Sequence, residues 1–222
     1  MRVMPKKRKV ANLLALAVLA TLIERPMHRY EIAAQMRERG KDRDMDIKWG
    51  SLYTVVQNLE KHGFVEVIGS ERDGARPERT IYRLTDAGRA EAEDWIRELI
   101  STPEPEPHRF VAGLSVVALL PPDEVIPLLD ERARLLAAEI AVRRREIEEQ
   151  TQFLPRLFLV EAEFGVAMLE AEAAWVAGMR TELASGTFPD IDFWRRAHSE
   201  QIPPAEIAAM VEGGTFRQPT DD

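Results

Sequence analysis

The sequence has 222 residues, of which 45% are hydrophobic, enough to build a core for one large domain or two modest ones. It contains no cysteine, which excludes disulfides, thiolate zinc sites and thiol catalysis and makes a cytoplasmic location the expected one. The net charge is −8, but residues 1–100 hold 19 Lys and Arg against 16 Asp and Glu, whereas residues 101–222 hold 11 against 22. The acidity therefore belongs to the second half, and the first half can still meet a polyanionic partner.

The first predicted helix runs from about Lys9 to Glu24 and is apolar on nearly all sides, as expected for a helix buried under others. Its apolar run, residues 11–23, is shorter than the roughly 20 residues needed to span a bilayer. Pro26 ends this helix, and a second helix follows and ends near Gly40, which suits a left-handed cap.

Residues Gly50 to Gly63 predict a third helix with two different faces. Leu52, Val55, Val56 and Leu59 recur at the spacing of a narrow apolar stripe that would face a core. The opposite face carries the short or amide-tipped polar side chains and the cation of Thr54, Gln57, Asn58 and Lys61. These residue types reach base edges and phosphates in the DNA major groove, so this helix is the candidate recognition helix.

A two-stranded hairpin is predicted next, with strands at residues 64–68 and 80–84 and a turn that contains Asp73-Gly74. Three helices followed by such a hairpin make a winged helix-turn-helix. Arg72, Arg76 and Arg79 lie on this wing, where they are expected to contact phosphate or the minor groove. The basic cluster of residues 6–9 is expected to form an arm beside the same DNA.

The second half is predicted to be helical. A fourth helix begins after the N-cap Thr85 and ends near Ile100, and the three prolines of residues 101–107 mark a linker. Two long helices follow, at about residues 123–150 and 155–184; apolar residues are spaced by threes and fours in the second and form a looser seam in the first. Such helices pair with each other or with a second subunit. The expected domains are therefore 1–100, a linker 101–107, a helical domain 108–212 and a disordered tail 213–222.

Four ordered motifs resemble the PadR family of bacterial transcription regulators. They are residues 26–32 (PMHRYEI), 50–56 (GSLYTVV), 59–65 (LEKHGFV) and 76–88 (RPERTIYRLTDAG). The long helical second half resembles that of the larger PadR subfamily, whose second domain carries dimerisation. The resemblance implies a mainly α fold: an N-terminal winged helix-turn-helix, of three helices plus a two-stranded wing, followed by an all-helical C-terminal dimerisation domain. It also implies a homodimeric repressor on a roughly two-fold operator, released by a small hydrophobic or phenolic effector.

Three sets of site residues follow from the sequence and the resemblance. The residues expected to contact DNA are His28, Tyr30, Lys48, Ser51, Tyr53, Thr54, Gln57, Asn58, Lys61, Arg72, Arg76 and Arg79. The residues expected at the dimer interface are Leu129, Leu136, Ile140, Leu157, Phe164, Met168, Trp175 and Met179. The residues expected to contact an effector are Trp95 and Trp175.

Several alternatives stay open from the sequence. His28 contacts the DNA backbone, caps its helix or faces solvent. Tyr53 either contacts phosphate or packs against the wing, and Trp49 is either a hinge-packing residue or part of a ligand wall. The four histidines lack metal-ligand spacing and no phosphate loop or nucleophile motif is present, so neither catalysis nor a cofactor is expected. The alternative function is a helical protein-interaction or ligand-sequestering module whose winged helix does not bind DNA.

Overall fold

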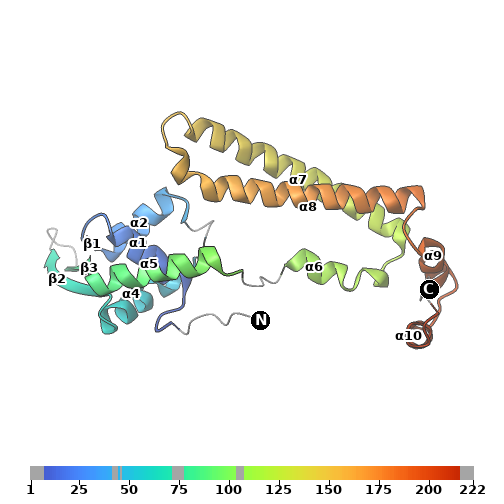
Figure 1. Cartoon of the computed structure of the whole chain (residues 1–222), viewed down its shortest axis with the longest axis horizontal. Coiled ribbons are helices and arrows are strands. Elements are labelled where there is room, and N and C mark those ends of the chain that lie inside the picture. Colours follow the sequence, from blue (N-terminus) through green and yellow to red (C-terminus); the bar gives the residue numbers. More distant parts are fainter. Residues whose placement is uncertain (1–7, 42–44, 46, 72–77, 104–107, 216–222) are drawn as a thin grey trace. The chain divides into compact units, whose positions relative to one another are not determined.

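The computed structural model describes residues 8–41, 45, 47–71, 78–103 and 108–215 (Figure 1). The chain divides into two compact units, unit 1 over Met1–Pro105 and unit 2 over Glu106–Asp222. Most of the expected linker and of the expected tail lies outside the described residues, so these two segments remain predictions.

Helix α1 (Leu13–Leu22) forms the centre of unit 1, and eight of its ten residues are buried. It begins four residues later than predicted because the Asn12 side chain accepts a hydrogen bond from the Leu14 amide at 2.8 Å and so caps the helix there. Being buried on almost every side, it has the nearly uniform apolar composition that the sequence indicated.

Two further helices, α2 (Arg29–Glu38) and α4 (Leu52–Lys61), pack on α1 and complete the helix-turn-helix. A single 3-10 turn, η1 (Trp49–Ser51), leads directly into α4. The whole predicted apolar stripe of α4 is buried in the same core as α1, with Leu59 and Val56 each only 1% exposed. The face of α4 opposite this stripe is therefore free to carry polar side chains.

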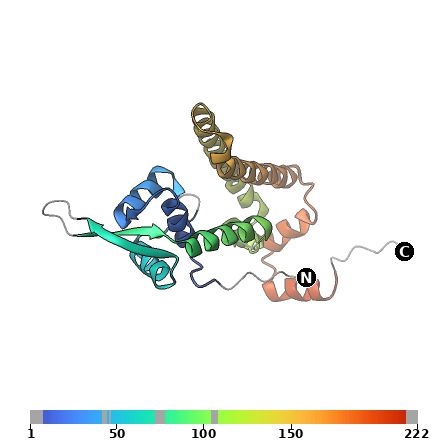
Figure 2. The same ribbon diagram turned by 60° about the vertical axis from the view of Figure 1, so that its left-hand side comes forward.

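The sheet has three strands, β1 (Met27–His28), β2 (Val65–Glu71) and β3 (Arg79–Leu84), in the antiparallel order β1-β3-β2. Figure 2 shows β2 and β3 as a long hairpin that projects from the helices of unit 1. The sequence missed β1, because two residues are too short to show an alternating pattern. The pairing of Met27 with Tyr82 and of His28 with Ile81 ties the start of α2 to the wing.

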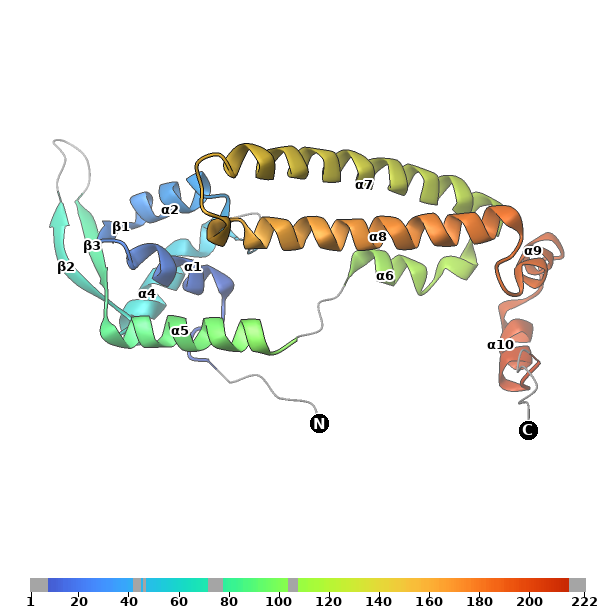
Figure 3. The same ribbon diagram turned by 45° about the horizontal axis from the view of Figure 1, so that its top comes forward.

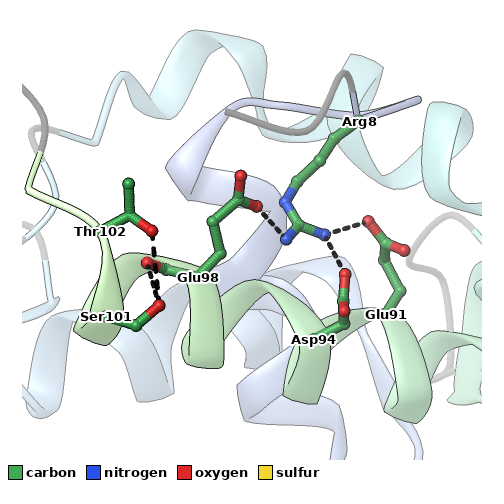
Figure 4. Close-up of polar contacts among 6 residues, drawn as sticks. All are labelled: Arg8, Glu91, Asp94, Glu98, Ser101 and Thr102. Atoms are coloured by element: carbon green, nitrogen blue, oxygen red, sulfur yellow. Dashed lines mark hydrogen bonds and ion pairs between the residues drawn. The ribbon is translucent and has the colours of Figure 1, made fainter. Parts of the chain in front are cut away.

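Helix α5 (Asp86–Ser101) closes unit 1, and the Thr85 hydroxyl caps it by accepting from the Gly88 amide at 3.0 Å. Arg8 lies against α5 with its side chain only 3% exposed, and its guanidinium pairs with Glu91, Asp94 and Glu98 (Figure 4). The expectation of a basic arm beside DNA is thus wrong for Arg8, which is held by carboxylates of its own unit. Lys6 and Lys7 lie outside the described residues.

Unit 2 is built on two long antiparallel helices, α7 (Pro122–Gln150) and α8 (Val160–Ser185), which lie side by side in Figures 1 and 3. The remaining elements are α6 (Arg109–Leu114), η2 (Val117–Leu119), η3 (Arg156–Phe158), α9 (Ile191–Ser199) and α10 (Pro204–Glu212). Pro127 is the sixth residue of α7, and because proline has no amide hydrogen the Asp123 carbonyl lacks its usual partner four residues later, although the helix continues through this position. Over the described residues, no helix is both long and apolar enough to cross a membrane.

The apolar residues of α7 and α8 separate into an inner and an outer set. Val176 and Leu183 of α8 are fully buried against Leu129 and Leu136 of α7, in one core. The outer set is mostly the stripe expected in the sequence, with Leu157 73%, Phe164 67% and Trp175 48% exposed. Leu129 and Leu136 therefore stabilise the unit internally, whereas the outer face of α8 is available to a second subunit.

Candidate nucleic-acid interface

The polar face of α4 is solvent-exposed along its whole length. Thr54, Gln57, Asn58 and Lys61 are all exposed, while the apolar stripe of α4 is buried. The burial of the apolar stripe fixes the rotation of α4, so these four side chains project together from one surface of unit 1. That is the geometry a recognition helix needs to enter a major groove.

A cluster of aromatic rings and guanidinium groups lies beside the start of α4. The Arg29 guanidinium lies 5.0 Å from the ring centre of Tyr30 and 5.1 Å from that of Tyr53, and it donates a hydrogen bond to the Tyr30 hydroxyl at 3.1 Å. Arg79 of the wing lies 5.6 Å from the Tyr30 ring. The rings hold two cations in place, as cation–π contacts do.

These side chains border an open cavity of about 320 Å³. Its walls come from the start of α2, from Tyr53 of α4 and from Arg79, Thr80 and Tyr82 of β3. Glu78 also borders the cavity and accepts a hydrogen bond from Ser70 of the neighbouring strand. Three elements of the winged helix thus converge on one basic, aromatic recess of a size that can admit a phosphate group.

His28 links the helix to the wing. Its Nδ1 accepts from the Glu31 amide at 3.1 Å, the Glu31 carboxylate accepts from the His28 amide at 3.0 Å, and the two form a capping box. Its Nε2 lies 3.3 Å from Nη1 of Arg79. Because the ring is buried, the capping alternative describes its structural role, and a direct contact with DNA stays a prediction.

Tyr53 and Gln57 form a pair on the surface of α4. The Gln57 side-chain amide donates to the Tyr53 hydroxyl oxygen at 2.7 Å, one helical turn away. This bond orients the Gln57 carboxamide, which can still pair with an adenine through its remaining donor and acceptor. Tyr53 is half exposed at 51% and faces the cavity, so it is accessible for a phosphate contact.

The segment before α4 combines packing with exposure. Trp49 packs against the core of unit 1, and the Arg37 guanidinium lies 4.2 Å from its ring centre, which favours the hinge-packing interpretation of this residue. Lys48 is exposed, and its carbonyl accepts from the Ser51 hydroxyl at 2.7 Å. Lys48 is therefore free to reach a phosphate, while Ser51 secures the turn into α4.

Arg29 was missed by sequence reasoning. It is the first residue of α2, and a cation at the start of a helix next to a tyrosine is the sequence signal that could have identified it. Its hydrogen bond to Tyr30 lowers the pKa of that phenol below its ordinary value. Arg72 and Arg76 lie outside the described residues, so of the three wing arginines expected to contact DNA the structure locates Arg79.

The two tryptophans expected at an effector site lie in different units. Trp95 is only 5% exposed in the core of unit 1, with Arg8 5.2 Å from its ring centre. Trp175 of α8 is 48% exposed and meets the ring of Phe110 edge to face at 5.7 Å. Trp95 thus has a packing role, and an effector contact for either residue stays a prediction.

Residues 18–94 match the sequence model of the family described as the transcriptional regulator PadR-like family. A probable transcriptional regulator of Mycobacterium tuberculosis, Rv1176c, is 29% identical over 93 residues, which cover 40% of this chain and 46% of that protein. The match therefore spans less than half of this relative.

Solved structures extend the likeness to most of the chain. Bacillus subtilis PadR in complex with operator DNA matches with a TM-score of 0.64 and 19% identity, over 77% of this chain and 99% of that one. The same protein in complex with p-coumaric acid gives a TM-score of 0.63 at 19% identity, over 78% and 99% of the two chains. At such identity the likeness establishes the fold, and it confirms the predicted class: mainly α, with an N-terminal winged helix and further helices after it.

Proposed function

Through residues 18–94 the chain belongs to the PadR-like family of transcriptional regulators, and we propose that it represses transcription by binding a specific DNA sequence as a homodimer. The observation that carries this proposal is the shared surface of α4, the start of α2 and β3. There, exposed hydrogen-bonding side chains lie next to two arginines held by tyrosine rings. DNA recognition needs hydrogen-bonding side chains for base edges and cations for phosphates next to each other, whereas a surface that binds only protein does not need this combination.

Within this surface the side chains divide into readers and anchors. Gln57 and Asn58 project from the middle of α4 and are the readers, since carboxamides form bidentate pairs with adenine worth about 1 to 3 kcal/mol of discrimination. Arg29, Arg79 and Lys61 are the anchors, because cations beside the groove neutralise phosphates of any sequence. Arg72 and Arg76 join the anchors on sequence grounds alone.

Dimerisation is proposed to involve the outer face of α8. Phe164, Met168 and Trp175 recur there at intervals of four and seven residues, and each is at least 48% exposed. Leu157, in the preceding turn η3, is exposed as well. A contiguous apolar stripe of this kind is unusual on a monomer and is typical of a helix that pairs with another subunit. A dimer would present two α4 helices to half-sites about 34 Å apart on one side of the duplex.

We propose that a small-molecule effector controls DNA binding by this chain. The B. subtilis structure with p-coumaric acid motivates the idea that a small hydrophobic or phenolic molecule releases this chain from its operator. Such release needs a ligand that binds one arrangement of the two DNA-binding units more tightly than the other.

The proposal is tested by selecting bound sequences from a random duplex library with the purified full chain. We expect one roughly two-fold sequence to be enriched. Gln57→Ala should then lose preference at one base position per half-site and bind the other positions as before. Arg79→Ala should weaken binding to all sequences alike. The opposite pattern would overturn the division into readers and anchors, and no enrichment at all would reject specific binding.

The dimer is tested by sedimentation. We expect the wild-type chain to sediment as a dimer and Phe164→Glu to sediment as a monomer, because a charge on the outer face of α8 cannot be buried at an apolar interface. As a matched control, Glu161→Gln on the same helix should leave the dimer intact. A wild-type monomer with full DNA affinity would contradict the dimer proposal.

A further inference from the structure

Unit 2 contains a cavity of about 630 Å³. It shares no lining residue with the cavity of the DNA-binding surface. It lies between α6, η2 and the first turns of α7. Val125 and Leu129, both buried, form part of its floor, while Leu119 and Leu128 form an exposed apolar rim. The volume falls in the range of small-molecule pockets, about 300 to 1,000 Å³.

One wall of this cavity is held in place by α9. The indole N–H of Trp194 donates to the Leu120 carbonyl at 2.9 Å, and Nε2 of His198 lies 2.9 Å from the Ala118 carbonyl oxygen. These two contacts fix the backbone of the η2 segment from outside the cavity. The recess is therefore formed before any ligand arrives, which lowers the ordering cost of binding.

The cavity also has a basic border. Arg132 stacks on the ring of Phe110, 3.7 Å from its centre, and its Nε donates to the Glu172 carboxylate at 2.7 Å. Its charge is thus already compensated. Arg109 also lines the cavity, and in the described part of the chain no carboxylate pairs with it. An apolar recess with a cation at its edge that pairs with no described carboxylate fits a molecule with an apolar body and one acidic group.

We propose that this recess binds small amphipathic anions, meaning a carboxylate or sulfonate attached to an aliphatic or aromatic body. The body contacts the apolar floor and rim, and the acidic group pairs with Arg109. Neither tryptophan named from the sequence lines this cavity, although Trp175 packs on Phe110 of its wall. Binding at this site is measured without DNA. Its failure is therefore distinguishable from failure of the proposed function.

Gly113 of α6 offers a direct way to fill the recess. It lines the cavity, and a Cβ built on it meets no atom within 4 Å. A side chain can therefore begin at this position without a close contact at its Cβ, and we expect a leucine here to occupy part of the cavity. The neighbouring Ala112 is exposed on α6 and does not line the cavity, so Ala112→Leu adds the same side chain to the same helix outside the site.

The experiment titrates the full chain with anilinonaphthalene sulfonate, an aromatic anion that fluoresces in apolar surroundings, and then displaces it with octanoate or with 1-octanol. We expect saturable fluorescence that octanoate displaces at lower concentration than octanol. Gly113→Leu should weaken octanoate binding by at least about tenfold, whereas Ala112→Leu should stay within about twofold of wild type. Arg109→Gln should weaken octanoate by about fivefold and leave octanol unchanged.

Two results would overturn the proposal. Equal octanoate binding by Gly113→Leu and Ala112→Leu would mean that the anion binds elsewhere, for example on the outer face of α8. Equal displacement by octanoate and octanol, unaffected by Arg109→Gln, would mean that the recess does not recognise an acidic group.

Discussion

Gly88 of α5 is the position where the smallest substitution should have the largest effect on the DNA-binding unit. A Cβ built there would lie 2.0 Å from the Phe64 carbonyl oxygen, 2.8 Å from its carbon and 2.9 Å from Cδ1 of Leu84. The two nearest atoms belong to the backbone and not to a flexible side chain, so they cannot move aside without shifting the chain. The same Phe64 oxygen accepts from the Thr85 amide at 3.1 Å, and the Thr85 hydroxyl donates to the Gly63 carbonyl at 2.7 Å.

The cost of Gly88→Ala follows from these contacts. To admit the methyl group, α5 must move away from the start of β2, which breaks about three hydrogen bonds worth about 1 kcal/mol each. The better helix propensity of alanine returns about 1 kcal/mol. We therefore expect a net loss of about 2 kcal/mol in the free energy of unfolding of unit 1.

Hydrogen exchange measures this loss locally, because the amides of α1 exchange only when unit 1 opens. We expect the α1 amides of Gly88→Ala to exchange about 30-fold faster than wild type, the equivalent of about 2 kcal/mol. Gly178→Ala on α8, where a Cβ meets no atom within 4 Å, is the matched control and should not destabilise the chain. Wild-type exchange in Gly88→Ala would refute the close approach of α5 to Phe64.

Three further predictions concern charged side chains. Arg8→Ala should destabilise unit 1 by about 2 kcal/mol in the same exchange assay, because three carboxylates of α5 lose their shared cation; unchanged exchange would contradict the buried pairing. The Arg39 hydrogen bond holds the pKa of Glu24 below its ordinary value of 4.5, so the pair's stabilisation is complete above pH 4.5 and is lost as pH falls through the lower folded-state pKa. Glu24→Gln should therefore lower the free energy of unfolding by less than about 1 kcal/mol at neutral pH and should not change it in strong acid. Urea unfolding at both pH values measures this difference. An equal loss in acid would contradict the pairing of Glu24 with Arg39. Arg29→Ala should weaken binding to every DNA sequence by about tenfold and reduce the salt slope by about 1, whereas Arg97→Ala on α5 should change neither.

The recognition helix could be predicted from sequence because its signal is local. Leu52, Val55, Val56 and Leu59 repeat with the helical period, and that period alone decides which residues are buried and which are exposed. The N-cap at Thr85 and the turn at Gly63 are likewise read within a few residues. The face of α4 that carries Gln57 thus followed from the sequence before any contact was known.

The parts that escaped prediction depend on residues far apart in the chain. Arg8 meets its carboxylates more than 80 positions later, and no periodicity reports such a pairing. Arg29 owes its place to the distance between Tyr30 and Tyr53, which the packing of α2 against α4 sets. The spacing of apolar residues in α8 could not distinguish the side that packs inside the unit, where Val176 and Leu183 are fully buried, from the side on which Trp175 is exposed.

The central claim, that the surface of α4, α2 and β3 binds DNA, is tested most directly by the salt dependence of duplex affinity. The full chain is titrated with its selected duplex at about 50 mM and about 200 mM salt. Neutralising about four phosphates predicts an affinity loss of about 100-fold between these conditions. An affinity that hardly changes with salt, or no binding even at low salt, would contradict the account and favour a winged helix that contacts protein instead.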